Sequence, residues 1–127
     1  MEILESVRVC MEKALDKAMV AGHNVESGLK AIGITNQREM TLVWSKSTRD
    51  PLYNAIDWMD VKTSSICRRL EESLPGCRTH FKETIGLPVS TYFSALKLIW
   101  LLENVDIVKA AAQSGDALFS IVDTWLI

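Results

Sequence analysis

The sequence has few cysteines and histidines. Its three cysteines, Cys10, Cys67 and Cys77, are odd in number and show no CxxC spacing, so a complete disulfide framework is excluded. This cysteine usage favours a reducing compartment, and we expect the cytoplasm. The two histidines, His23 and His80, lie far apart and outside any zinc-ligand spacing. A metal site built only from side chains of this chain is therefore not expected.

The sequence also lacks a strong excess of one charge and long hydrophobic runs. It has 14 Lys and Arg against 16 Asp and Glu, a formal net charge of −2, which gives no reason to expect nucleic acid or an anionic membrane as partner. The apolar run at 98–102, LIWLL, is far too short to span a bilayer. Glu2 and Glu5 fall within an amphipathic pattern, which argues against a secretory signal.

Common catalytic and nucleotide-binding motifs are missing as well. The sequence contains neither GxGxxG nor GxxxxGK[ST], and no Ser/His/Asp or Cys/His constellation stands out. Asp57, Asp60 and Asp123 are possible acid–base residues. Each also fits a cap or the edge of a strand, and we prefer the caps.

Periodic apolar patterns are present, in a composition of 48% hydrophobic and 24% charged residues that is ordinary for a globular domain. They predict helices at 2–20, 60–74, 79–85, 94–105 and about 106–114, strands at 29–35 and 117–122, a β-hairpin from 41–44 and 52–56, and a final helical turn from 123. Strands alternating with helices indicate an α/β fold. The 29–35 strand is apolar on both faces and the terminal helices lack partners, so we expect a fragment of a larger protein.

The dipeptide Arg38-Glu39 directly follows the predicted strand at 29–35. In α/β sheets the ligand crevice opens beyond the carboxyl ends of the strands. Arginine only donates hydrogen bonds and ionised glutamate only accepts them, so together they suit the neighbouring hydroxyls of a 1,2-diol. The alternative is a solvated ion pair on a loop.

Two aromatic residues are further candidates. Trp58 ends the predicted hairpin, where it would form an apolar wall against the carbon skeleton of a small polar ligand or simply pack. Tyr92 lies in the loop before a predicted helix, where its hydroxyl would reach a ligand or make a contact within the loop. Ser94 is the expected N-cap of that helix.

Several long motifs resemble one family. They are AIGITNQRE at 31–39, LVW at 42–44, PLYNAIDW at 51–58, IGLPVSTYFSALKLIWLLENV at 85–105 and ALFSIVDTWLI at 117–127. In order and spacing they resemble the glycerol kinases, most closely the plant branch, within the FGGY carbohydrate kinases. Met40, Asp57, Ile99 and the Ser120-Ile121 pair depart from the family pattern, and none of them is a substrate-contact position.

The resemblance implies a fold and an activity. Glycerol kinases have two ribonuclease-H-like, actin-like domains with ATP and glycerol in the cleft between them, and residues 1–127 correspond to an internal part of the N-terminal domain. The implied reaction is ATP-dependent phosphorylation of glycerol to glycerol 3-phosphate. ATP and Mg²⁺ are the implied cofactors of the full-length enzyme, with neither expected on this chain alone. Full-length relatives commonly self-associate, so a homo-oligomer is a further expectation.

The resemblance also implies roles for single residues. Arg38 and Glu39 would bind glycerol hydroxyls, Trp58 would line the glycerol pocket and Tyr92 would hydrogen-bond the substrate. The phosphate-binding loop would precede Met1, and the catalytic aspartate would follow Ile127. No catalytic residue or metal ligand is therefore assigned here, and the chain alone is expected to be inactive. Alternatives are another FGGY polyol or sugar kinase, or a non-catalytic interaction protein derived from a truncated kinase.

Overall fold

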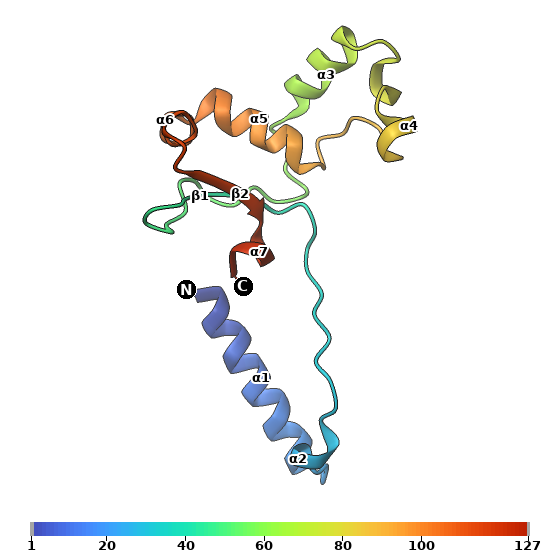
Figure 1. Cartoon of the computed structure of the whole chain (residues 1–127). Coiled ribbons are helices and arrows are strands. Elements are labelled where there is room, and N and C mark those ends of the chain that lie inside the picture. The colour runs from blue at the N-terminus through green and yellow to red at the C-terminus, as the bar shows by residue number, and fades with distance from the viewer. Residues whose placement is uncertain (1, 127) are drawn as a thin grey trace. The chain divides into compact units, whose positions relative to one another are not determined.

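The computed structural model describes residues 2–126, and the chain divides into two units after Thr35. The first unit holds the helices α1 (Glu2–Val20) and α2 (Val25–Gly28), labelled in Figure 1. The amphipathic helix predicted at 2–20 is confirmed. It ends where Gly22 adopts a φ of +85°, a backbone conformation that glycine reaches without a steric penalty.

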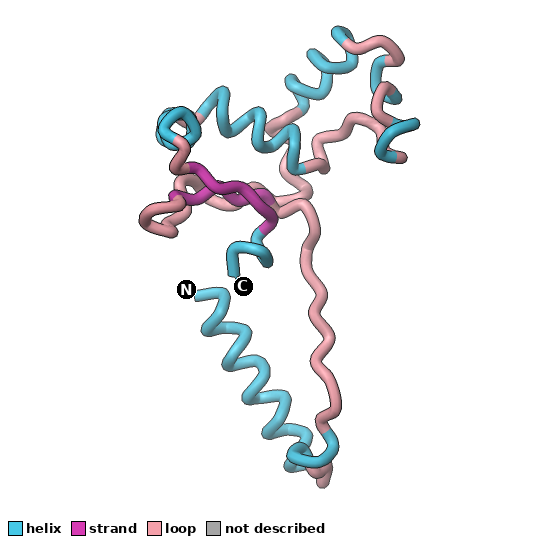
Figure 2. Tube along the Cα trace, in the orientation of Figure 1, coloured by secondary structure: helices cyan, strands magenta, loops and turns pink. Residues whose placement is uncertain are grey.

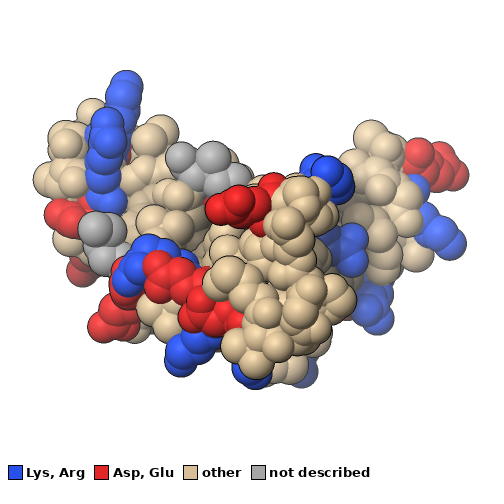
Figure 3. Space-filling view, turned by 90° about the horizontal axis from the view of Figure 1, so that it is seen from below, with Lys and Arg blue, Asp and Glu red and all other residues tan. Residues whose placement is uncertain are grey.

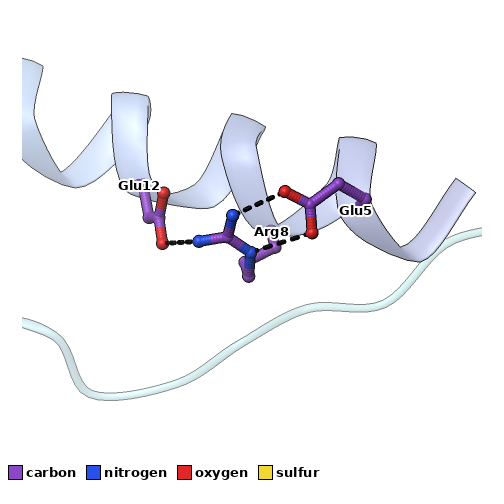
Figure 4. A network of polar contacts seen from close by, with 3 residues as sticks. All are labelled: Glu5, Arg8 and Glu12. Atoms are coloured by element: carbon purple, nitrogen blue, oxygen red, sulfur yellow. Dashed lines mark hydrogen bonds and ion pairs between the residues drawn. The ribbon is translucent and has the colours of Figure 1, made fainter. Parts of the chain in front are cut away.

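An exposed charge network lies along α1 (Figure 4). Arg8 Nε donates to Glu5 Oε2 at 3.1 Å, and the other guanidinium nitrogens pair with Glu5 Oε1 at 2.5 Å and with Glu12. The spacings of three and four residues place these side chains on one face of the helix. The hydrogen bond from Arg8 lowers the pKa of Glu5. Because all three side chains are exposed, the network adds little to stability.

The strand predicted at 29–35 is wrong. The segment forms an irregular loop before β1 (Figure 2), and it leaves Ile32 and Ile34 exposed at 68% and 82%. A strand satisfies its backbone N–H and C=O groups by pairing with a neighbour. Within residues 2–126, no other strand pairs with this segment. Its apolar composition therefore does not produce a strand in the described part of the chain.

The second unit contains a two-stranded antiparallel sheet. β1 (Thr41–Ser45) pairs with β2 (Ala117–Ile121), in a register that runs from Thr41 opposite Ile121 to Ser45 opposite Ala117. The strand predicted at 117–122 is thereby confirmed, apart from its last residue, which starts the helix α7. Asp116 fixes the start of β2, because its carboxylate accepts from Ser45 Oγ at 2.6 Å and from Ser47 N at 2.9 Å.

The other edge of β1 carries the returning arm of the predicted hairpin. Thr41 and Ile56 exchange backbone hydrogen bonds of 3.0 and 2.8 Å, and Leu52 N donates to Val43 O at 2.9 Å. The hairpin connection is thus confirmed. Its second arm makes isolated bridges rather than a continuous strand, since Pro51 at its start has no N–H to donate.

Helices make up most of the rest of this unit (Figure 1). They are α3 (Ser64–Ser73), the 3₁₀ turn η1 (Cys77–Thr79), α4 (Lys82–Ile85), α5 (Ser94–Asn104), α6 (Asp106–Ser114) and α7 (Val122–Leu126). The helix predicted at 60–74 begins later, because two aspartates form local turns before it. Asp57 Oδ1 accepts from Met59 N, and Asp60 Oδ1 accepts from Lys62 N, both at 2.8 Å.

The core of the second unit consists of two clusters that meet at α5. Val43, Ile56, Leu101 and Val108 form the cluster against the sheet. Ile66, Cys67, Val89 and Leu96 form the cluster against α3. Trp100 packs against both clusters. Helix α5 therefore connects the sheet to α3, and this packing holds the N-terminus of α5 in place.

Surface chemistry is mixed. Acidic and basic side chains both occur on the face shown in Figure 3, among wide uncharged areas. Cys10 and Cys77 are free and exposed, and Cys67 is free and buried. Among residues 2–126, no helix combines the length and apolar character needed to cross a membrane.

Candidate functional site

Glu39 occupies an unusual backbone position directly before β1. It lies in a turn with Arg38 and has a φ of +67°, a left-handed conformation that costs a non-glycine residue about 1–2 kcal/mol. Its carbonyl oxygen accepts hydrogen bonds from Lys97 Nζ at 2.6 Å and from Thr41 Oγ1 at 3.3 Å. The surrounding structure therefore holds the turn in this conformation.

The carboxylate of Glu39 caps helix α5. Its Oε2 accepts from both Ser94 N and Ser94 Oγ, each at 2.6 Å. The first N–H groups of a helix lack partners within it, and the helix dipole favours a negative charge there. The prediction that Ser94 itself caps the helix is wrong, since Ser94 is the first helical residue and Phe93 holds the N-cap position without a side-chain bond.

One oxygen of this carboxylate remains open. Within residues 2–126, Glu39 Oε1 makes no hydrogen bond, whereas Oε2 takes both donors of Ser94. The carboxylate is thus oriented by the scaffold through one atom and presents the other as an acceptor. This arrangement suits a ligand hydroxyl, which donates a single hydrogen.

Lys97 is a residue of this site that the sequence analysis did not single out. Its side chain is fully buried, and Nζ donates to Glu39 O at 2.6 Å and to Tyr92 O at 2.9 Å. Burial lowers the pKa of Lys97, and the charges of Glu39, Asp57 and Asp60 oppose part of that shift. The available signal was its place in the apolar run LKLIWLL, four residues before the core residue Leu101, because residues four apart share a helix face.

Two aromatic rings meet beside this turn. The ring centroids of Trp58 and Tyr92 lie 6.1 Å apart with an edge-on interplanar angle of 66°. Phe93 also contacts the Tyr92 ring, with 5.3 Å between centroids. Trp58 remains 38% exposed, and it lies inside the turn in which Asp57 Oδ1 accepts from Met59 N. The pair forms a partly exposed apolar wall.

The structure brings three of the four predicted residues together. Glu39 and Tyr92 both bind Lys97 through their carbonyl oxygens, and Trp58 contacts the Tyr92 ring. Arg38 joins them only as the chain neighbour of Glu39, and it is exposed. The site thus combines an exposed cationic donor, an oriented carboxylate acceptor and an aromatic wall, which are groups for binding a small polar ligand.

The three candidate aspartates have different surroundings. Asp57 and Asp60 shape the turns around Trp58, and Asp60 also forms an ion pair with Lys62 at 3.1 Å. Burial raises the pKa of Asp60, but the hydrogen bonds and charge of Lys62 outweigh that effect and lower it overall. Asp123 is not the predicted cap, since it lies inside α7, and its Oδ1 is buried without a hydrogen-bond partner among the described residues.

Within residues 2–126, no group of three or more His, Cys, Asp or Glu side chains is arranged to hold a metal ion. The acidic residues near Lys97 serve turns and a helix cap instead.

Comparison with known proteins gives consistent matches along the whole chain. Residues 1–127 match the N-terminal domain of the FGGY family of carbohydrate kinases. Glycerol kinase of Arabidopsis thaliana is 68% identical over 127 residues, which is all of this chain and 24% of that protein. Glycerol kinase of Clavibacter michiganensis is 45% identical over the whole chain, again 24% of that protein. The chain thus spans about a quarter of the length of these relatives.

A solved structure supports the fold. The crystal structure of Plasmodium falciparum glycerol kinase with ADP matches with a TM-score of 0.69 and 36% sequence identity, over 77% of this chain and 19% of that one. This match confirms the predicted α/β fold, a partial ribonuclease-H-like, actin-like domain, and the predicted resemblance to glycerol kinases. With a family match that covers its full length, the chain belongs to the FGGY family of carbohydrate kinases.

Proposed function

We propose that this chain supplies part of the glycerol site of a glycerol kinase, an enzyme that transfers the γ-phosphoryl group of ATP to glycerol. The relatives named glycerol kinase, at 68% and 45% identity over the whole chain, support this assignment. The observation that carries it is the Glu39 carboxylate, which the scaffold orients through Oε2 while Oε1 accepts no hydrogen bond from the described residues.

The site residues suit a small triol. Glu39 Oε1 accepts a hydrogen bond from one glycerol hydroxyl, and the Arg38 guanidinium donates to the adjacent one. Trp58 packs against the carbon atoms, and the Tyr92 hydroxyl binds a further oxygen. A site that pairs particular hydroxyls disfavours analogues that lack them, because buried polar partners are then left unmatched.

The role of this chain in the reaction is to position the acceptor. Phosphoryl transfer needs Mg²⁺-bound ATP, an acceptor hydroxyl in line with the γ-phosphorus, and a carboxylate that takes the hydroxyl proton. When bound, Mg²⁺ would offset negative charge on the transferred phosphoryl group. We assign the phosphate-binding loop, the catalytic aspartate and the second domain to parts of the enzyme outside residues 1–127.

A chimeric kinase tests this proposal. In it, residues 1–127 replace the matching segment of the Arabidopsis thaliana glycerol kinase, which is 68% identical. We expect ATP-dependent phosphorylation of glycerol, measured by coupled release of ADP. A soluble chimera without this activity would refute the assignment. A preference for another polyol or sugar over glycerol would assign the chain to a sister kinase.

The variant Arg38→Ala tests the site within that chimera. Loss of a charged hydrogen bond costs about 1.5–3 kcal/mol, so we expect the KM for glycerol to rise about ten- to a hundredfold. The KM for ATP should stay within about twofold, since Arg38 serves only the acceptor. Arg68→Ala, which removes an exposed arginine on α3, is the matched control. An unchanged glycerol KM in Arg38→Ala would remove Arg38 from the site.

A further inference from the structure

We propose that Lys97 is a positioning residue of the polyol site, which sets the relative placement of Glu39 and Tyr92. This inference rests on the proposed function. Lys97 does not reach a ligand itself, since it is fully buried and its ammonium group donates to two main-chain carbonyls. It acts through the two residues whose carbonyl oxygens it binds.

The partners of Lys97 are unusual for a buried lysine. Within residues 2–126, no carboxylate oxygen lies within ion-pair distance of Nζ, and its bonds go to Glu39 O at 2.6 Å and Tyr92 O at 2.9 Å. Burying an ammonium without a direct counter-ion is costly, and an apolar residue at the same core position would avoid that cost. We therefore attribute the lysine at this position to the orientation of the two carbonyl groups, and not to a gain in folding stability.

The first carbonyl belongs to the strained turn at Glu39. The φ of +67° directs the Glu39 carbonyl toward α5 and its carboxylate toward Ser94. Without the charged donor at Nζ, only the weaker bond from Thr41 Oγ1, at 3.3 Å, would hold this carbonyl. The turn would then relax, and the open oxygen of Glu39 would lose its fixed direction.

The second carbonyl belongs to Tyr92, whose ring contacts Trp58. The Lys97 ammonium lies 5.9 Å from the Tyr92 ring centroid as well as bonding its carbonyl. One side chain thus ties together the acceptor Glu39, on the turn before β1, and Tyr92 of the aromatic wall, on the loop before α5. The charges that face Lys97 are Glu39 on the turn before β1, and Asp57 and Asp60 in the turns between the hairpin and α3.

The test compares variants of the chimeric kinase. Lys97→Met keeps the length and apolar stem but removes the donor and charge, and we expect its KM for glycerol to rise about ten- to a hundredfold. The KM for ATP should stay within about twofold. Val108→Ala, which truncates a buried residue on α6 that has no assigned place in the site, is the control for lost stability, and its glycerol KM should not change.

A double-mutant cycle separates positioning from a merely structural role. Because Lys97 acts through both Glu39 and Tyr92, adding Lys97→Met to Glu39→Gln should raise the glycerol KM by a smaller factor than Lys97→Met does in the unaltered chimera, since coupled residues are not additive. Additive effects would contradict the proposal, as would an unchanged glycerol KM in Lys97→Met.

Solubility and basal activity are also decisive. If Lys97→Met is insoluble, Lys97→Gln, which keeps a polar group on a shorter side chain, takes its place with the same expected rise. Loss of soluble protein in both variants would identify Lys97 as a folding residue and overturn the inference. A chimera that never phosphorylates glycerol would refute the proposed function, whereas an active chimera with an unaffected Lys97→Met would refute only the role of Lys97.

Discussion

At the scale of single residues, Glu39 serves two structures with one carboxylate. Oε2 caps α5 through Ser94, and in the proposed site Oε1 accepts a hydrogen bond from a glycerol hydroxyl. The isosteric variant Glu39→Gln separates the two tasks. Its amide oxygen still accepts from Ser94, which turns the amide nitrogen, a donor, toward the position where a hydroxyl would donate.

We therefore expect Glu39→Gln in the chimeric kinase to raise the glycerol KM about tenfold or more, with a smaller loss of thermal stability than Glu39→Ala, since glutamine keeps the cap and loses only the charge. Glu39→Ala should raise the KM and also lose the cap, which is worth about 0.5–2 kcal/mol. Thermal unfolding and steady-state kinetics on both variants check this. A glutamine variant that binds glycerol normally would show that Oε1 is not the acceptor.

Asp116 gives a prediction about pH. The hydrogen bond from Ser45 is the main cause that lowers the pKa of Asp116 below its ordinary value of 3.8. A carboxyl group with a lowered folded-state pKa stabilises the fold above pH 3.8, and this contribution is lost as pH falls through the folded-state pKa. Asp116→Asn should therefore lower the melting temperature of the chimeric kinase near neutral pH, and the difference should shrink as the pH falls below 3.8.

Melting curves of Asp116→Asn and of the unaltered chimera, recorded from about pH 2.5 to about pH 7, would measure this difference. This range extends on both sides of an ordinary aspartate pKa. The matched control is Asp106→Asn, which alters an exposed aspartate in the first turn of α6. A destabilisation that is equal at all pH values would contradict the role assigned to the Ser45–Asp116 bond.

At the scale of elements, the ends of helices depend on backbone conformation as much as on apolar patterns. Helix α6 ends where Gly115 adopts a φ of +74°, and the following Asp116 N donates back to Ala111 O at 2.8 Å. A β-carbon at Gly115 would meet no atom within 4 Å. Any loss of stability on replacing Gly115 with alanine would therefore come from the backbone conformation alone.

Gly115→Ala should lower the stability of the chimeric kinase by about 1 kcal/mol, because an L-residue is disfavoured at positive φ. Gly28→Ala is a suitable control. A β-carbon at Gly28 would also meet open space, but the φ of Gly28 is not positive. Alanine there should be neutral or slightly stabilising. Equal effects at the two glycines in thermal unfolding would contradict this account.

The elements also show which parts of the fold a sequence predicts. Helix α1, strand β2 and the hairpin connection were predicted from apolar spacing and turn residues, and the structure confirms them. The start of α3 was missed because Asp57 and Asp60 bind nearby backbone N–H groups, a local competition that periodicity does not register. The 29–35 strand failed because pairing depends on a neighbour, which composition alone does not supply.

The candidate site was only partly predictable for the same reason. Arg38, Glu39, Trp58 and Tyr92 were proposed from their residue types and from the resemblance to a family. Neither source places Lys97 between Glu39 and Tyr92. The Lys97–Glu39 contact joins residues 58 positions apart in the chain, and it forms only when α5 packs on the sheet.

At the scale of the whole molecule, the described chain leaves many large apolar side chains exposed. Val20 is 90% exposed and Ile34 is 82% exposed. The chain also spans 24% of the length of its Arabidopsis thaliana relative. Both facts fit a segment that completes its packing against other parts of a kinase.

The isolated 127-residue chain should therefore show no glycerol-dependent release of ADP, whereas the chimeric kinase should show it. Binding of a dye that fluoresces on apolar surfaces should be stronger for the isolated chain than for the chimera, per mole of protein. Glycerol-dependent ADP release by the purified chain alone would contradict the assignment of the transfer machinery to other parts of the enzyme.

The double use of the Glu39 carboxylate has a consequence for how such a site changes over evolutionary time. A lineage that replaced Glu39 to accept a new substrate would also uncap α5, the helix that joins both core clusters. Arg38 and Trp58 are exposed and carry no comparable duty toward the scaffold among the described residues. New substrate preferences should therefore arise first at these two positions, while the acceptor beside the helix is inherited unchanged.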